Sequence, residues 1–273
     1  MPGRAPRVTK TEAIVIRQRR LGDADRIISL ITPLRGKVDV VAKGVLRSKS
    51  RMAGHLEPLT HVEVVLAHGR SMDVVTQAQA VESFTSLRAD LDRLSAALYL
   101  AELSDRFTVE HAEATGLFGL LHDALVRLNR GDGQQVVTRT YELALLEATG
   151  FRPEWTRCLG CALDVPADEA RWSAVEGGVI GPECATKYPV ALTIDATALR
   201  VLRAYQSQPY EEAGRIRLTD DLAARLEQIM HSLMRAVAER ELKSAAFVSA
   251  ARYARVAEEA AEPDEEGDEG LEV

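Results

Sequence analysis

The chain has 273 residues, of which 46% are hydrophobic and 5% aromatic, and its formal net charge is −7. This composition supports an aliphatic core and excludes an intrinsically disordered chain. The chain has no apolar run of about 18 residues, no apolar signal segment at its polar N-terminus, and an odd number of cysteines, three. We therefore expect a cytoplasmic protein with two domains, or one domain with an appendage, and neither a membrane protein nor a secreted disulfide-bonded one.

Positive charge is concentrated at the N-terminal end of this acidic chain. The first 51 residues contain 13 Lys and Arg against 4 Asp and Glu, net +9, whereas the remaining 222 contain 21 against 37, net −16. Such a local excess indicates a surface that binds a polyanion. The candidate phosphate contacts are Arg19, Arg20, Arg35, Lys37, Lys43, Arg47, Lys49, Arg51 and Arg70.

The basic segment is predicted to fold into a β-barrel. Short apolar runs, with alternation of apolar and polar residues at 11–17 and 62–67, predict five strands, at residues 11–19, 25–32, 37–43, 61–67 and 72–81. This number and length favour an OB-fold, which binds nucleic acid across strands two and three, although an SH3-like barrel fits the pattern nearly as well. No aromatic residue precedes Phe84, so binding would depend on phosphate charge rather than on base stacking.

After Phe84 the hydrophobic period changes from two residues to 3.6, which predicts helices. The predicted helical stretches are 87–101, 117–128, 137–148, 195–206 and 219–237. The expected fold class is therefore α+β and multidomain, with an OB-fold domain at 1–83, a helical domain at 84–256 interrupted by an insertion at 152–190, and an acidic tail at 257–273. From Glu258 the chain has nine acidic residues and no basic one, so the tail is predicted to be disordered. Alternatively, it could fold back onto the basic residues as a mimic of DNA.

The insertion contains all three cysteines in an incomplete zinc-ribbon pattern. Cys158 and Cys161 form a CxxC pair, and Cys184 follows 23 residues after Cys161. A second CxxC would need a cysteine at the position of Gly181. Three groups could complete a weaker Zn²⁺ site: Glu183, Asp164 or a water molecule. The alternative is a metal-free ribbon held together by packing around its two tryptophans.

No enzyme signature is present. The chain lacks GxSxG, Walker-type, HExxH and GxGxxG motifs, and its six histidines are scattered. We expect a binding protein without a nucleotide cofactor. Two other functions are open: an RNA-binding OB-fold accessory protein, and an enzyme that uses the three cysteines.

Several segments, in order, resemble the bacterial RecO family of DNA repair proteins. They are Thr11–Arg17, Leu21–Ile27, Thr32-Pro33 with Gly36-Lys37, Ala42–Val45 with Arg47, Leu56–Pro58, Cys158–Cys161, Gly177–Val179 and Arg240–Ser244. The resemblance spans about residues 10–248. It departs from the family at Gly181, where many relatives have cysteine, which puts a zinc site in doubt but not the fold.

The resemblance implies an N-terminal OB-fold, a helical domain and a ribbon insertion. It also implies a nucleoid-associated mediator of homologous recombination in the RecF pathway, which binds ssDNA and dsDNA and anneals complementary strands. Such proteins bind the acidic tail of single-strand binding protein and act with RecR to help RecA replace that protein on DNA. Arg139 matches a basic position at which the tail docks; the alternative is an ordinary exposed helix charge.

Overall fold

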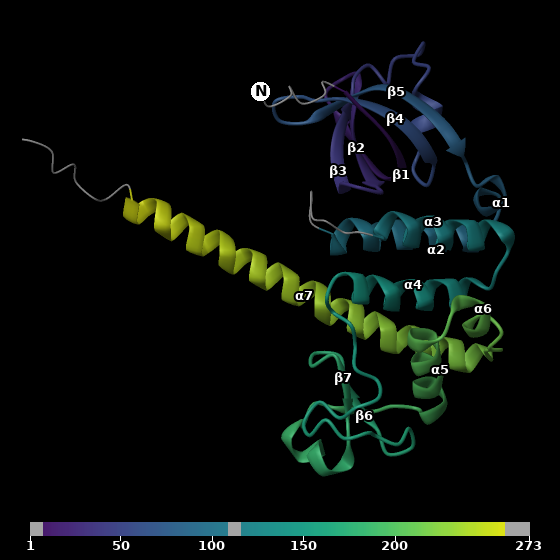
Figure 1. The fold of residues 1–273 in the computed structure, drawn as a ribbon, viewed down its shortest axis with the longest axis vertical. Coiled ribbons are helices and arrows are strands. Elements are labelled where there is room, and N and C mark those ends of the chain that lie inside the picture. Colours follow the sequence, from purple (N-terminus) through teal and green to yellow (C-terminus); the bar gives the residue numbers. More distant parts are fainter. Residues whose placement is uncertain (1–7, 109–115, 260–273) are drawn as a thin grey trace, which may run out of the picture.

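The computed structural model describes residues 8–108 and 116–259, with side chains as far as Glu239 (Figure 1). Within these residues no helix has the length and apolar character needed to cross a membrane. The strands are β1 Val8–Leu21, β2 Asp25–Thr32, β3 Gly36–Ala42, β4 His61–Ala67, β5 Asp73–Glu82, β6 Arg171–Ser173, β7 Gly178–Ile180 and β8 Leu192–Thr193. The α-helices are α1 Thr85–Arg88, α2 Leu91–Phe107, α3 Leu117–Arg130, α4 Gln134–Ala148, α5 Ala196–Ser207, α6 Tyr210–Ala213 and α7 Asp220–Glu259. Two short 3-10 helices span Ala53–Leu56 and Pro182–Lys187.

The first five strands close into a barrel in the order β1-β2-β3-β5-β4, and β1 pairs with β4 to complete it. All neighbours are antiparallel except β3 and β5, which are parallel. This connectivity confirms the OB-fold and sets aside the SH3-like alternative. The five predicted strands agree with the observed ones to within a few residues at each end.

The two faces of β1 are both buried, but against different partners. Ala13 and Val15 point into the barrel interior, where they pack with aliphatic residues of β2, β3 and β4. Ile14 and Ile16, which point the opposite way because side chains alternate along a strand, belong to the core shared with the helices. The barrel is therefore seated on the helical domain through one outer face (Figure 1).

The helices begin and end at residues suited to those positions. Asp90 interrupts the helical stretch predicted at 87–101, because its carboxylate accepts the backbone N–H groups of Asp92 and Arg93 and so starts α2 as a separate helix after the one-turn α1. Gly131, at a φ of 98°, ends α3 with its N–H bonded to the carbonyls of Arg127 and Leu128. The remaining predicted helices correspond to α3, α4, α5 and α7.

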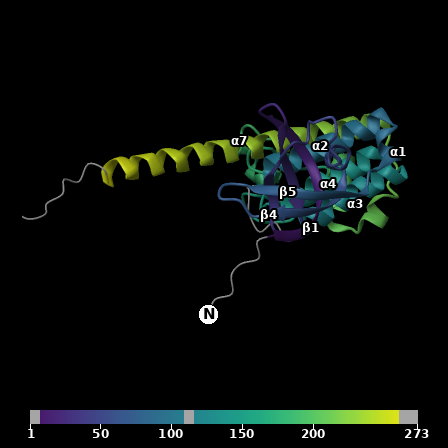
Figure 2. The same cartoon turned by 90° about the horizontal axis from the view of Figure 1, so that it is seen from above.

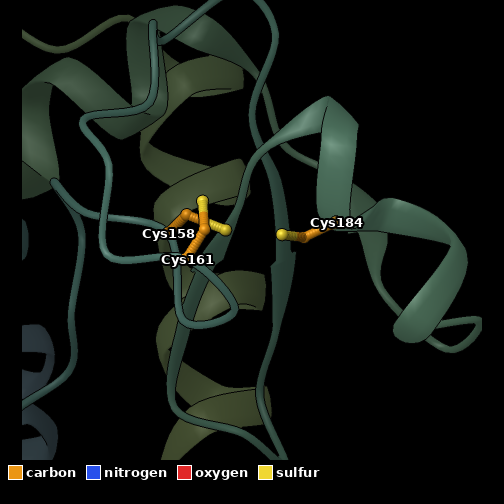
Figure 3. A group of neighbouring side chains, drawn as sticks. All are labelled: Cys158, Cys161 and Cys184. Carbon is orange, nitrogen blue, oxygen red and sulfur yellow. The ribbon is translucent and has the colours of Figure 1, made fainter.

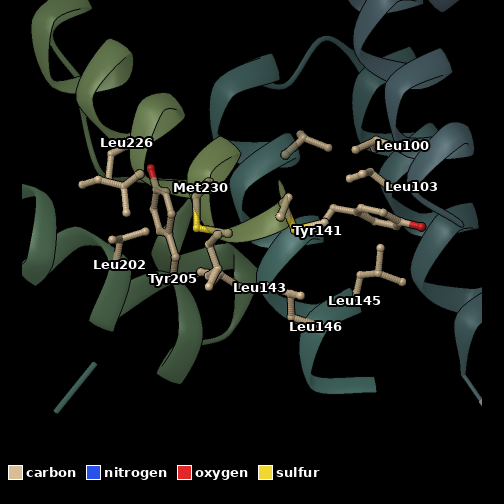
Figure 4. Close-up of a cluster of buried hydrophobic side chains, with 14 of the residues drawn as sticks. Leu100, Leu103, Tyr141, Leu143, Leu145, Leu146, Leu202, Tyr205, Leu226 and Met230 are labelled. Carbon is tan, nitrogen blue, oxygen red and sulfur yellow. The ribbon is translucent and has the colours of Figure 1, made fainter. Parts of the chain in front are cut away.

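Helix α4 lies at the centre of the helical domain. Figure 4 shows Tyr141 and Leu145 directed toward Leu100 and Leu103 of α2, while Leu143 is directed the other way, toward Met230 of α7. Because it is covered on both sides, α4 is buried around most of its circumference. Helix α7 packs here with its first half and then runs well past the other helices to Glu259 (Figures 1 and 2). The tail predicted to be disordered from residue 257 is helical as far as Glu259, and its remainder, 260–273, lies outside the described residues.

The predicted insertion forms a small ribbon on the side of the helices away from the barrel (Figure 1). Its sheet has the order β7-β6-β8, and the rings of Trp155 and Trp172 lie 6.2 Å apart in its core. Gly178 is required by packing, because a Cβ atom there would lie 2.6 Å from the carbonyl oxygen of Glu154. The loss of helical periodicity at 152–190 is thus explained by a separate β-unit.

Candidate nucleic-acid interface and cysteine cluster

The long loop between β3 and β4 presents unpaired positive charge to solvent. Lys43, Arg47, Lys49 and Arg51 are all exposed, and none forms an ion pair with any residue that the structure describes. Arg70, in the turn between β4 and β5, is also exposed and lacks an ion pair among the described residues. Because no described residue neutralises these charges, they are candidates for binding an external anion.

Three of the other candidate cations are bound to carboxylates of the protein. Arg19 pairs with Asp39, Arg35 with Asp73 at 2.6 Å, and Lys37 with Asp105 at 2.6 Å. The carboxyls of Asp73 and Asp105 are partly desolvated, which raises their pKa, but the cations beside them have the larger combined effect and leave each pKa below its ordinary value. Arg20, the last of the nine, donates to the carbonyl of Gly22. The nine cations therefore differ in availability.

A basic hollow of about 430 Å³ lies beside the loop between β3 and β4. It is lined by Gln18, Arg19, Arg20, Asp23, Arg26 and Leu46. Two contacts hold the β1–β2 turn against the loop: the carboxylate of Asp25 accepts the N–H of Gly44 at 2.7 Å, and the N–H of Leu46 donates to the carbonyl of Ala24 at 2.9 Å. Asp25 thus fixes the loop through its backbone, as expected for an aspartate in a turn.

The helical domain contains a cluster of three polar side chains, Arg139, Glu142 and Tyr99, of which the first two are buried. Arg139 and Glu142 are 5% and 0% exposed, and their Nε and Oε2 atoms lie 3.3 Å apart without the alignment of a hydrogen bond. The hydroxyl of Tyr99 donates to the other oxygen of Glu142 at 2.7 Å. Arg139 also lines a hollow of about 270 Å³ between α2, α4 and α7, and its Nη1 has no hydrogen-bond partner among the described atoms.

Burial raises the pKa values of two members of this cluster, Glu142 and Tyr99. Removal from water raises the pKa of Glu142 to about 7, even though Arg139 and the Tyr99 hydroxyl act in the opposite direction. Burial, together with the adjacent carboxylate, also raises the pKa of Tyr99. The carboxyl of Glu142 therefore binds a proton at a higher pH than an exposed glutamate does.

The three cysteines converge in the ribbon, as predicted (Figure 3). Their Sγ atoms all lie within 4.8 Å of one another; Cys158 and Cys184 are buried, and Cys161 is exposed. The N–H groups of Gly160 and Gly181 point at Cys158 Sγ, at 3.4 and 3.2 Å. Burial raises the pKa of Cys158, but these amides outweigh it and leave the pKa below its ordinary value, whereas the hydrogen bond with Cys161, together with burial, raises the pKa of Cys184.

Both halves of the chain match models of one family. The model described as Recombination protein O N terminal matches residues 7–84, and the one described as Recombination protein O C terminal matches residues 88–246. The chain belongs to the RecO family. Three similar RecO proteins, each named DNA repair protein RecO, come from Roseiflexus sp. (strain RS-1), Dehalococcoides mccartyi (strain CBDB1) and Symbiobacterium thermophilum. They are 40%, 32% and 35% identical to it, and the alignments cover 90%, 91% and 89% of this chain and 87%, 98% and 98% of those proteins.

The cysteines of this RecO protein provide only part of a closed zinc site. Structural zinc sites have four protein ligands, and the group here has three. Neither Glu183 nor Asp164 belongs to it, and Gly181, in the fourth position, contributes a backbone N–H instead. Three convergent thiols nevertheless fit a Zn²⁺ ion that keeps one position for water. The cluster is therefore a possible metal site of the open type.

In this RecO protein the basic residue matched to the docking position is not a surface charge. The alternative that Arg139 is an ordinary exposed helix charge is wrong, because its side chain is almost fully enclosed between helices. Its neighbour Glu142 was not among the predicted site residues. Their spacing of three residues on one helix is the sequence signal that could have identified the pair.

Two further basic residues near the barrel surface were also missed. Arg26 lines the basic hollow, and Arg17 donates to Asp105 of α2 at 2.7 Å. Arg17 and Arg19 have the same parity along β1 as Ala13 and Val15, which fill the barrel, but both are exposed because the pairing register of β1 shifts between Val15 and Arg17. Strict alternation would have placed both side chains inside the barrel, so the pattern alone could not identify them as residues of the outer face.

Proposed function

We propose that this protein is a DNA repair and recombination mediator. In this proposal it binds ssDNA and dsDNA through the barrel, anneals complementary strands and, with RecR, helps to load RecA onto DNA coated by single-strand binding protein. Family membership supports the repair role, because the similar proteins are named for it. The proposed activity needs no nucleotide cofactor and no catalytic residue.

The observation that carries the DNA-binding part is the unpaired charge of the β3–β4 loop. Lys43, Arg47 and Lys49 are exposed on an OB-fold and have no acidic partner among the described residues. Each phosphate that such a residue neutralises releases condensed counterions, which favours binding and makes it salt-dependent. Two strands bound to the same cations are also screened from each other, so complementary bases can meet without further chemistry.

The test is annealing of two complementary oligonucleotides coated with the cognate single-strand binding protein, with no nucleotide present. We expect rapid annealing that declines as salt increases. The variant K43E/R47E/K49E should anneal slowly. A matched variant, K187E/R200E/R215E, makes the same change in net charge at exposed positions of the ribbon and helical domain and should anneal normally. Equal activity of the two variants would exclude the loop as the binding site.

For the partner protein, we propose that the hollow beside Arg139 receives the acidic tail of single-strand binding protein. A buried guanidinium with an unsatisfied Nη1 at the wall of a hollow is suited to a carboxylate, since a charge-assisted hydrogen bond would satisfy it. Gln134 and Gln135, in the first turn of α4, line the same hollow and bring the positive end of the helix dipole to it, which opposes the negative charge of Asp92 and Glu227 in its lining.

Binding of a fluorescent peptide with the tail sequence tests this second part. R139M/E142Q removes the guanidinium without leaving a buried carboxylate unpaired, and it should abolish peptide binding while the fold is retained. R106A removes an exposed arginine of α2 and serves as the control. If the double variant folds and binds the peptide as the unmodified chain does, the tail docks elsewhere.

For the cysteine cluster, we propose Zn²⁺ held by Cys158, Cys161, Cys184 and a water molecule. Metal analysis of the purified chain and of C161S tests occupancy. G181C should bind zinc more tightly, because a Cβ atom at this position would lie 3.8 Å from Cys158 Sγ and 3.5 Å from Val165, which is ordinary contact. Zinc affinity that is unchanged in both variants would show that the cluster does not bind the ion.

A further inference from the structure

The cysteine cluster differs from a closed metal site in one respect that affects its chemistry. In a closed site four ligands surround the ion and protect the thiolates. Here the fourth position holds only the backbone of Gly181, and Cys161 is exposed to solvent. A small oxidant can therefore reach Cys161 Sγ directly, while Cys158 lies behind it as a buried neighbour.

The backbone between the CxxC residues is already bent as a disulfide would require. Residues 159–161 form a turn, closed by the N–H of Ala162 to the carbonyl of Cys158 at 2.8 Å. This i→i+4 bond closes an α-turn with the reach of one helical turn, in which Cα atoms three residues apart lie about 5 Å from each other, and disulfides need Cα atoms about 4.4–6.8 Å apart. Cys158 and Cys161 can thus be joined with little backbone movement. Cys184 comes from a separate element, the 3-10 helix Pro182–Lys187, on the other side of the cluster (Figure 3).

From this geometry we propose that Cys158 and Cys161 form a reversible disulfide in response to peroxide, so that the ribbon is a redox-sensitive element of this protein. Cys161 Sγ attacks hydrogen peroxide, the O–O bond breaks, and the products are Cys161 sulfenic acid and one water molecule. Cys158 Sγ then attacks the Cys161 sulfur, the S–S bond forms, and the hydroxyl leaves with the Cys158 proton as a second water molecule. Two thiols are oxidised, one peroxide is reduced, and a thiol reductant reverses the change.

Tryptophan fluorescence can be used to follow the ribbon during this step. The chain has two tryptophans, Trp155 and Trp172, and both are buried in the ribbon core beside Cys158. Intrinsic tryptophan emission therefore reports on the ribbon and on its contact with the neighbouring helices, and not on the barrel. This reaction takes place away from the barrel, so it can be measured whether or not the proposed DNA activity is correct (Figure 1).

The experiment uses the full chain, reduced and treated with a chelator so that no metal shields the thiols, and then exposed to hydrogen peroxide. Alkylation and mass spectrometry should show that the number of free thiols falls from three to one, that the peptide containing residues 158–161 has lost two hydrogens, and that dithiothreitol restores it. C161S should abolish this response and C184S should retain it. Tryptophan emission checks that the ribbon of each variant is folded.

The peptide map of the unmodified chain decides the question even if a variant fails to fold. Three thiols that persist after peroxide would overturn the proposal. So would a disulfide that includes Cys184, or oxidation of Cys161 that stops at sulfenic or sulfinic acid. A reversible Cys158–Cys161 bond is the one result that supports it.

Discussion

The barrel and the helical domain both present arginine and lysine side chains at proposed binding sites, but in opposite surroundings. The β3–β4 loop of the barrel holds its cations in solvent, with no ion pairs to described residues. Arg139 of α4 is 5% exposed and lies against a carboxylate that is 0% exposed. The first arrangement contributes little to folding and remains available to a ligand, whereas the second is a constituent of the core.

This difference implies different ways of binding an anion. Exposed cations attract a phosphate backbone through charge alone, so that affinity depends on salt and tolerates any sequence. A desolvated guanidinium with an unsatisfied N–H recognises one group in one position, and the contact is screened much less. In the proposed function the barrel would therefore bind DNA generally, and the helical domain would recognise a partner specifically.

The largest effect is expected when the buried pair is broken. At pH 8, where Glu142 of the unmodified chain is ionised, R139A would remove the cation from a buried pair, and such a change costs about 3–5 kcal/mol of the free energy of unfolding. Urea denaturation measures this loss. As a control, R106A removes an exposed arginine paired with Glu102 at 3.2 Å and should cost about 0.5 kcal/mol or less. Similar losses in the two variants would show that Arg139 is not desolvated in solution.

A second expectation concerns the β3–β4 loop and the salt dependence of DNA binding. Replacing Lys43, Arg47 and Lys49 with glutamate should make the dependence of log K on log salt less steep by about 2, since each phosphate contact with single-stranded DNA contributes about 0.7. The melting temperature should change little, because these side chains have no ion pair with a described residue to lose. An unchanged salt slope in a titration of a fluorescent oligonucleotide would contradict the contrast between the two regions.

The third expectation is a dependence of stability on pH. Burial raises the folded-state pKa of Glu142 from its ordinary value of 4.5 to about 7, so between these values the folded chain binds more protons than the unfolded one. Stability from this group is then complete below about pH 4.5 and is lost as pH rises toward 7, by at most about 1.4 kcal/mol per pH unit. Urea midpoints from pH 5 to 8 measure the slope. E142Q should remove it, and a slope that persists in E142Q would come from other groups.

The barrel could be predicted from sequence because its determinants are local. The apolar runs in residues 11–19 and 25–32, with a Pro and a Gly between the second and third strands, predict strands joined by a tight turn. The cluster of Cys158, Cys161 and Cys184 followed from spacing in the same way. In these cases the residues that determine the structure are neighbours in the sequence or belong to a known spacing.

The surroundings of individual charges could not be predicted, because they depend on residues far away in the chain. The periodicity of α4 places Val137, Tyr141 and Leu145 on one apolar face and leaves Arg139 elsewhere, which favours exposure. In the structure α2 covers one side of α4, and α5 and α7 cover the other, so Arg139 is buried as well. A periodic pattern identifies one buried face, and it does not show whether a second element covers the rest.

Two lysines at the ends of β3 give the smallest but most direct test of the comparison. Lys37 is 17% exposed and is bound to Asp105 of α2, whereas Lys43, just after the strand, is exposed. K37A should lower the free energy of unfolding by about 1 kcal/mol, because a half-buried contact between the barrel and α2 is lost, and the salt slope of DNA binding should stay unchanged. K43A should do the opposite, leaving stability within about 0.5 kcal/mol and making the slope less steep by about 0.7.

Both variants lose a lysine side chain from the same strand region, so a difference between them must come from Asp105, the partner of Lys37. A less steep dependence of log K on log salt in K37A would mean that Asp105 releases Lys37 when DNA binds. The barrel would then contact DNA on the side that faces the helices.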